Sequence, residues 1–214
     1  MKRARWVPLL VALAIVIAAG ATVAFVQRDG GSSTADTPLL TPPRATSTTT
    51  TTIAPSTTTT APPLPVPSRP PADPYAAVPV TQIGTISIPK IGLEHPIYEG
   101  IWLTVIDHGP GHWPGTALPG QRGNTVFPGH RVTHSHPFLN LDKLAPGDQI
   151  IFHMPGVDDV YAVRQTIIVK PTDMWVVDQT PTATVTLIAC HPKHSARERI
   201  VVKGDLVASI PKPR

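Results

Sequence analysis

The chain has 214 residues, of which 27 are proline and one is cysteine, and its formal net charge at pH 7 is +4. A single thiol excludes an internal disulfide. The positive charge is spread over the whole chain, and no basic stretch is interleaved with aromatic residues. The sequence therefore does not predict a nucleic-acid-binding protein.

The N-terminal residues have the pattern of a membrane anchor. Residues 1–6 include three positive charges, and residues 7–26 carry no charge. At about 1.5 Å per residue, a helix over 7–26 spans the roughly 30 Å hydrocarbon core, whereas the apolar part of a cleaved signal peptide has about 7–15 residues. Basic residues before the span place residues 1–6 in the cytoplasm. We expect a single-pass protein of the cell membrane whose anchor contacts lipid and whose remaining chain is extracellular. Small residues near the end of the span leave open whether the anchor is cleaved from the rest of the chain.

Residues 27–80 are rich in threonine and proline and contain almost no aromatic residues. Such a segment cannot bury enough apolar surface to offset the entropy lost on ordering, so we predict a disordered linker. Its reach is roughly 40 Å as a coil and roughly 170 Å as polyproline II. This length suits a tether that holds a domain away from the membrane, within a cell wall.

Residues 81–214 are predicted to form one all-β domain. Short β-type runs alternate with Gly and Pro turns, no segment shows a long helical period, and residues 138–145 could hold one short helix. This pattern is typical of a small sandwich or barrel. The predicted strands are Ile83–Ile88, His95–Tyr98, Asn124–Pro128, Asp148–His153, Val160–Val169, Thr182–Cys190, Arg199–Lys203 and Leu206–Ile210.

Cys190 is the candidate nucleophile, because a lone thiol outside the cell is either incidental or reactive. Cysteine acyl transfer also needs an imidazole that moves protons and a donor for the developing oxyanion. Local sequence favours His130, which follows a strand and a Pro-Gly turn, and Arg199, which begins the next strand after the thiol. Arg197 is the alternative to Arg199, since residues two apart lie on one face of a strand.

Four ordered motifs resemble the sortases, membrane-anchored cysteine transpeptidases of Gram-positive bacteria. They are GPGHWPGTALPGQRGN, the GHR around His130, the PFLNLDKLAPGD stretch after it, and TLIAC before Arg199. The resemblance covers essentially the whole domain and implies a sortase-like eight-stranded β-barrel with short helices. The linker, the short Cys190-to-Arg199 spacing and HPKHSARER after the thiol most resemble the class E enzymes of actinobacteria.

The resemblance implies a two-step reaction. Cys190 would attack the carbonyl after Thr in the LPxTG- or LAxTG-type sorting signal of a secreted protein, giving a thioacyl intermediate. His130 would act as general acid and base, and Arg199 would stabilise the oxyanion or orient the substrate. The acceptor would be an amine of a lipid II-type peptidoglycan precursor. His134 and Ala189 stand where class E enzymes commonly carry Tyr and Thr, and they are expected to contact the substrate.

Other functions stay open at this point. A pilus-polymerising sortase would use a lysine side chain as nucleophile, and a non-catalytic wall-facing binding module would have lost turnover. An L,D-transpeptidase is more distant, because its SHGC-type context is absent. No cofactor is expected. Spacings such as H-x-H occur in metal proteins, but surface or groove histidines are the favoured interpretation here, so no metal is expected either. The histidines concerned are His134, His136, His191 and His194.

Overall fold

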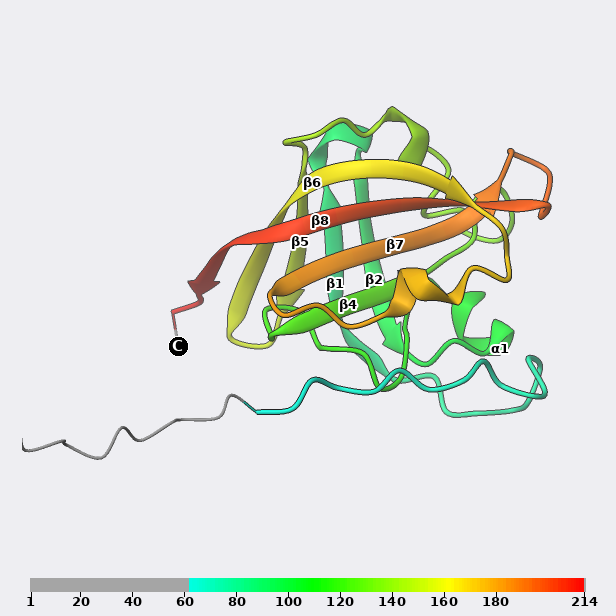
Figure 1. Ribbon diagram of the computed structural model, residues 1–214, viewed down its shortest axis with the longest axis horizontal. Helices are drawn as coiled ribbons and strands as arrows, with labels where there is room; N and C mark the ends of the chain where they lie inside the picture. Colours follow the sequence, from blue (N-terminus) through cyan, green and yellow to red (C-terminus); the bar gives the residue numbers. More distant parts are fainter. Residues whose placement is uncertain (1–61, 214) are drawn as a thin grey trace, which may run out of the picture. The chain divides into compact units, whose positions relative to one another are not determined.

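The structure is a computed structural model that describes residues 62–213 (Figure 1). The predicted anchor at 7–26 and the linker up to residue 61 lie outside the described residues. Within residues 62–213, every helix is too short or too polar to cross a membrane.

The described residues form an eight-stranded sheet that curls into a nearly closed barrel, as predicted (Figure 1). The strand order is β3-β2-β1-β5-β6-β8-β7-β4. Neighbours are antiparallel except for the β2–β3 and β4–β7 pairs, which are parallel. The two end strands meet where the Trp113 N–H, next to β3, donates to the Val126 carbonyl of β4 at 2.8 Å. The strands are β1 (Gln82–Ile88), β2 (Leu93–Glu99), β3 (Gly111–His112), β4 (Gly123–Pro128), β5 (Gln149–Met154), β6 (Val157–Val169), β7 (Ala183–His191) and β8 (Glu198–Pro211).

Every predicted strand overlaps a strand of the structure. The structure differs from the prediction in three places. The last two predicted strands are one continuous strand, β8, in which Gly204 lies at a crowded position and not at a turn: a Cβ there would come within 2.7 Å of the Ala162 carbonyl oxygen. β3 was not predicted, because a two-residue strand has no periodicity to detect. The short helix expected over 138–145 is only the 3₁₀ turn η2 (Leu141–Lys143).

The barrel interior is filled by apolar side chains that include an aromatic stack. The ring centroids of Phe127 and Phe152 lie 4.9 Å apart, and the Tyr161 ring meets Phe152 edge-on at 5.7 Å. All three residues are fully buried. Burial of this size is the main stabilising contribution in a domain of this length.

A second apolar cluster covers the outer face of β4, β7 and β8. It lies under α1 (Leu103–Ile106) and η3 (Met174–Val177), and Ile188 and Val201 are its members on β7 and β8. The neighbours of Ile188 along β7, Leu187 and Ala189, face the barrel interior instead. Because side chains alternate along a strand, Cys190 lies on the same outer face as Ile188. The fold thus places the thiol beside the second cluster and outside the barrel core.

Residues 62–80, which fall within the predicted linker, form neither helix nor strand but run along the barrel (Figure 1). We call them the N-terminal segment. Four of its carbonyl oxygens accept hydrogen bonds from residues of the domain: Pro62 from Arg122 at 2.7 Å, Ser68 from Trp113 at 2.9 Å, Pro74 from Leu103 at 2.7 Å and Ala76 from Thr104 at 3.0 Å. The 3₁₀ turn η1 (Pro89–Ile91) joins β1 to β2. The predicted domain boundary at residue 81 remains a prediction, but part of the linker is bound to the domain.

Candidate active site

Strand register brings His130 to Cys190. β4 and β7 pair in parallel, with Pro128 opposite Ile188, and the Gly129 N–H continues the pairing by donating to the Ile188 carbonyl at 2.9 Å. His130 lies two positions after Pro128, and Cys190 lies two positions after Ile188. The two side chains therefore reach the same end of the sheet. Gly129 is required at this turn, because a Cβ would lie 2.8 Å from the Phe138 ring.

Arg199 joins them through the antiparallel pairing of β7 and β8, in which it lies directly opposite Cys190. Ile200 faces the barrel interior and Val201 the outer cluster, so alternation places Arg199 on the outer face, where Cys190 lies. Arg197 precedes β8 and lies in the loop between the strands. His130, Cys190 and Arg199, which the sequence selected, therefore line one cavity.

The Arg199 guanidinium is held by the loop before it. Its Nη1 donates to the carbonyl oxygens of Ala196 and Glu198, both at 2.9 Å. These are backbone acceptors in an open loop, so the remaining donors of the guanidinium fork are available to an oxyanion or a substrate carbonyl.

Asp107, at the C-terminal end of α1, contacts the candidate general acid and base. Its Oδ1 lies 2.7 Å from Nε2 of His130 and 3.4 Å from Nδ1 of His134. The two imidazole rings stack with centroids 4.6 Å apart. The sequence did not indicate Asp107, because it lies 23 positions before His130 and becomes its neighbour only through the fold. A carboxylate in this position holds the ring in one orientation.

Arg131, the residue after the candidate histidine, fixes the end of β7. Its guanidinium is buried and donates to the carbonyl of Cys190 at 3.3 Å and to Nδ1 of His191 at 2.8 Å, and it pairs with Asp142 at 3.0 Å. Burial works to raise the pKa of Asp142, but its backbone hydrogen bond and the charges of Arg131 and Lys193 outweigh burial and hold that pKa below its ordinary value. The GHR motif thus supplies a structural cation beside the candidate catalytic histidine.

The remaining two predicted site residues occupy different positions. His134 lies in the loop after β4 and is exposed, with its ring over that of His130. Ala189 lines the cavity but is 2 % exposed, and its side chain packs in the barrel interior. Any contact between substrate and Ala189 would therefore involve its backbone, because alternation turns its methyl group away from the thiol.

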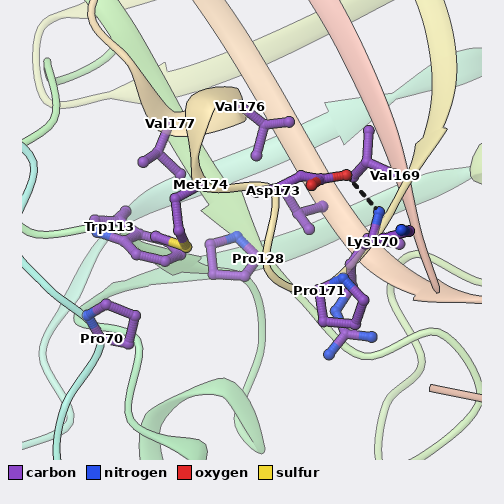
Figure 2. A pocket seen from close by; sticks show the side chains of 12 residues that line it. Pro70, Trp113, Pro128, Val169, Lys170, Pro171, Asp173, Met174, Val176 and Val177 are labelled. Atoms are coloured by element: carbon purple, nitrogen blue, oxygen red, sulfur yellow. Dashed lines mark hydrogen bonds between the residues drawn. The ribbon is translucent and has the colours of Figure 1, made fainter. Parts of the chain in front are cut away.

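A groove lined by apolar side chains together with Lys170, Asp173 and Arg199 extends from the cavity along the loop between β6 and β7 (Figure 2). The groove and the cavity share Pro128, Ile188 and Arg199, so they form one continuous depression. Pro70 of the N-terminal segment contributes to one wall of the groove. No residue in 62–80 lines the cavity that holds Cys190, so this segment forms a wall and not a lid over the thiol. The groove is lined by Pro70, Trp113, Pro128, Val169, Lys170, Pro171, Asp173, Met174, Val176, Val177, Ile188 and Arg199.

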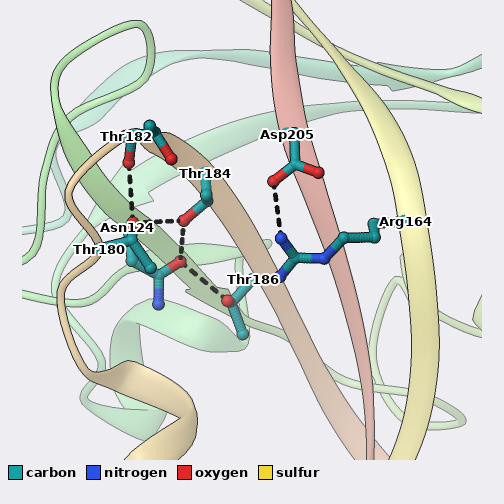
Figure 3. A network of polar contacts seen from close by, with 7 residues as sticks. All are labelled: Asn124, Arg164, Thr180, Thr182, Thr184, Thr186 and Asp205. Carbon is teal, nitrogen blue, oxygen red and sulfur yellow. Dashed lines mark hydrogen bonds and ion pairs between the residues drawn. The ribbon is translucent and has the colours of Figure 1, made fainter.

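The buried Asn124 amide holds η3 in place, and Figure 3 shows its bonds to Thr184 and Thr186. The Asn124 side-chain amino group donates to the carbonyl oxygens of Val176 and Asp178, both at 3.1 Å. Its Oδ1 accepts from the hydroxyls of Thr184 at 3.3 Å and Thr186 at 2.8 Å. One side chain of β4 therefore connects η3 and its loop to β7, and a fully bonded buried amide specifies a single loop position.

Comparison with known proteins gives a consistent result. The family described as "Sortase domain" matches residues 86–207, which is more than half of the chain. Sortase SrtE1 of Streptomyces coelicolor is 32 % identical over 145 residues, a match that covers 60 % of this chain and 41 % of the relative. Sortase D of Bacillus subtilis is 30 % identical over 128 residues, with 58 % and 63 % covered. The chain thus spans less than two thirds of the length of either relative.

Solved structures agree with these relatives. The crystal structure of sortase E1 from Streptomyces coelicolor, with a tripeptide in its active site, matches with a TM-score of 0.58 and 28 % identity, covering 62 % of this chain and 94 % of that one. A sortase D5 transpeptidase from Clostridium perfringens matches with a TM-score of 0.56 and 32 % identity, covering 59 % and 79 %. On the family match, the fold and the relatives, the chain belongs to the sortase family.

Proposed function

We propose that this protein is a class E-like sortase that cleaves an LPxTG- or LAxTG-type sorting signal between Thr and Gly and transfers the cleaved protein to an amine. The observation that carries the proposal is the single cavity lined by His130, Cys190 and Arg199, which opens into the groove. Likeness to a class E sortase and to a sortase described as a transpeptidase supports it.

In the first step, the Cys190 sulfur bonds to the carbonyl carbon after Thr, and the peptide bond to Gly breaks. The thiol proton passes to His130, and His130 delivers a proton to the leaving amine, so the step is balanced without a cofactor. Negative charge that develops on the carbonyl oxygen is stabilised by the free donors of Arg199. The product is a thioester between the signal and Cys190.

In the second step, an incoming amine attacks the thioester. His130 accepts the amine proton, the new amide bond forms and the Cys190 thiolate leaves. Because Nε2 of His130 faces Asp107 at 2.7 Å, Nδ1 is the nitrogen left to exchange these protons. Asp107 is a positioning residue in this scheme: it orients the ring and offsets the positive charge that the ring carries after it takes the thiol proton and before it protonates the leaving amine.

The groove suits the apolar residues of a sorting signal. Its lining next to the cavity is supplied mainly by Val169, Val176 and Ile188 together with prolines. Leu and the following Pro or Ala of a signal would bury apolar surface there, at roughly 25 cal/mol per Å². Binding at the groove would then place the Thr–Gly bond at the cavity with the thiol.

We propose that the protein acts outside the cell, at the membrane. The uncharged span at 7–26 after a basic hexapeptide supports an anchor, and the Thr/Pro-rich segment supports a tether. The acceptor proposed for this location is the amine of a peptidoglycan precursor. Likeness to a Streptococcus pneumoniae sortase C studied for pilin substrate specificity, at 31 % identity and a TM-score of 0.57, keeps a lysine side chain as the second candidate acceptor.

The deciding experiment incubates the full-length chain, in mild detergent, with LAxTG and LPxTG peptides and follows intact mass. A thioacyl adduct on the wild type that is missing in Cys190→Ala, with cleavage between Thr and Gly, is the expected result. Adding a glycine-type amine or a lysine-containing peptide then identifies the acceptor class. No adduct and no amine-dependent product with either peptide would refute the proposal and favour a binding module.

A further inference from the structure

Asp107, His130 and His134 point three metal-ligating atoms at one place on the rim of the catalytic cavity. We propose that this cluster binds a zinc-type divalent cation and that the bound ion blocks the histidine on which catalysis depends. The three ligand atoms all lie within 4.8 Å of one another. They come from the end of α1, the turn after β4 and the loop that follows it. The site exists only in the folded chain, which is why spacing alone did not reveal it.

The distances fit a tetrahedral ion. Zinc bonds of about 2.0–2.2 Å to nitrogen and oxygen put neighbouring ligand atoms about 3.3–3.6 Å apart. Asp107 Oδ1 lies 3.4 Å from His134 Nδ1, and 2.7 Å from His130 Nε2. The second pair has to open by about 0.6–0.9 Å. Two imidazoles and one carboxylate leave the fourth position to water, as in zinc sites with three protein ligands.

Both rings face one carboxylate oxygen. Both imidazoles direct a nitrogen at the same carboxylate oxygen while their rings stack at 4.6 Å with an interplanar angle of 28°. A divalent cation at this place would bond to both neutral rings and take the carboxylate as a counter-charge.

The cluster is accessible but well oriented. The side chains of His130, Asp107 and His134 are 18 %, 34 % and 46 % exposed, so an ion can reach them from solvent. His134 has a φ of 52°, a left-handed conformation that holds its ring over His130. The buried Arg131 guanidinium bonds to Cys190, His191 and Asp142.

The chemistry of the ligand atoms determines which divalent cations the site can bind. Imidazole and carboxylate suit Zn²⁺, Co²⁺, Ni²⁺ and Cu²⁺, whereas Ca²⁺ and Mg²⁺ prefer oxygen ligands only. The inhibitory consequence rests on the proposed function. An ion on Nε2 of His130 leaves the proton of the neutral ring on Nδ1, so the ring has no free nitrogen lone pair to accept the thiol proton and cannot form the imidazolium that protonates the leaving amine.

The test is a Co²⁺ titration of the full-length chain in mild detergent, with Zn²⁺ competing. We expect one ion per chain and the visible d–d absorption of tetrahedral Co²⁺, in the wild type and equally in Cys190→Ala. His134→Ala and Asp107→Ala should each weaken binding by at least about tenfold. The matched control is His153→Ala, since His153 and Asp158 form an equally short pair of 2.7 Å but lie outside the cluster. This variant should bind as the wild type does.

Two results would overturn the proposal: binding that survives both His134→Ala and Asp107→Ala, or a sulfur-to-cobalt charge-transfer band that disappears in Cys190→Ala. As a second readout, Zn²⁺ should inhibit acyl transfer by the wild type, and a chelator should restore it. His134→Ala, compared with its own metal-free rate, should need at least about tenfold more Zn²⁺. If the chain cleaves no sorting peptide, the proposed function fails while the titration still decides the metal site.

Discussion

Replacing Arg199 by alanine is expected to reduce kcat/KM for a sorting peptide about 10²- to 10³-fold while leaving the fold intact. Loss of one oxyanion donor costs about 2.7–4 kcal/mol of transition-state stabilisation. In the ground state the same guanidinium bonds only two carbonyl groups of the loop at Ala196 and Glu198. Water can replace it there, so the free energy of unfolding should fall by no more than about 1 kcal/mol.

The assay is a steady-state measurement with a fluorogenic sorting peptide, accompanied by thermal unfolding. Arg197→Ala is the matched control, because Arg197 lies two residues earlier, in the exposed loop and outside β8. It should change kcat/KM less than about threefold, within the small range of a surface substitution. Arg199→Lys, which keeps the charge but loses the planar fork, should fall between the two. Equal losses in both alanine variants would refute the assignment based on strand alternation.

Three further changes test other parts of the site and the core. Asp107→Asn should lower kcat/KM about 10- to 100-fold, the value of a hydrogen bond to a charged group, whereas Asp158→Asn, which alters an equally short histidine pair, should not. Asn124→Ala leaves several buried partners unbonded and should lower the free energy of unfolding, measured in urea, by at least about 2 kcal/mol. Burial raises the pKa of Tyr161 to about 12, and an unfolded tyrosine ionises near pH 10. The stability that the raised pKa of Tyr161 contributes is therefore complete below about pH 10 and is lost as pH rises toward about 12. The free energy of unfolding of the wild type should fall by about 1.4 kcal/mol between about pH 9 and about pH 11, and that of Tyr161→Phe should fall by less. A Tyr161→Phe protein with the same alkaline loss would contradict that assignment.

Strands and the main site residues could be predicted from the sequence, because both leave local signals. Alternating apolar residues mark the strands, and a lone Cys190 at a strand end marks the candidate nucleophile. Asp107 could not be predicted, since its relation to His130 depends on where α1 packs. The orientation of Ala189 depends on strand alternation, which turns its methyl group into the barrel even though it precedes the thiol. The contacts of the N-terminal segment with the barrel could not be predicted either, because a proline-rich composition indicates how the isolated segment behaves and not which surface it binds.

The sixty-residue spacing between His130 and Cys190 has a structural explanation in strand register. β4 and β7 are parallel, so each residue of one strand keeps the same offset from its partner in the other, as in Pro128 with Ile188. Both functional residues then follow their paired residue by two positions. Insertions in the loops between β4 and β7 would change the spacing without moving either side chain. One inserted residue between Pro128 and His130 would shift the imidazole relative to the thiol and abolish transfer. The geometry of the site therefore depends on how many residues separate His130 from Pro128 and Cys190 from Ile188, the last pair of the β4–β7 ladder.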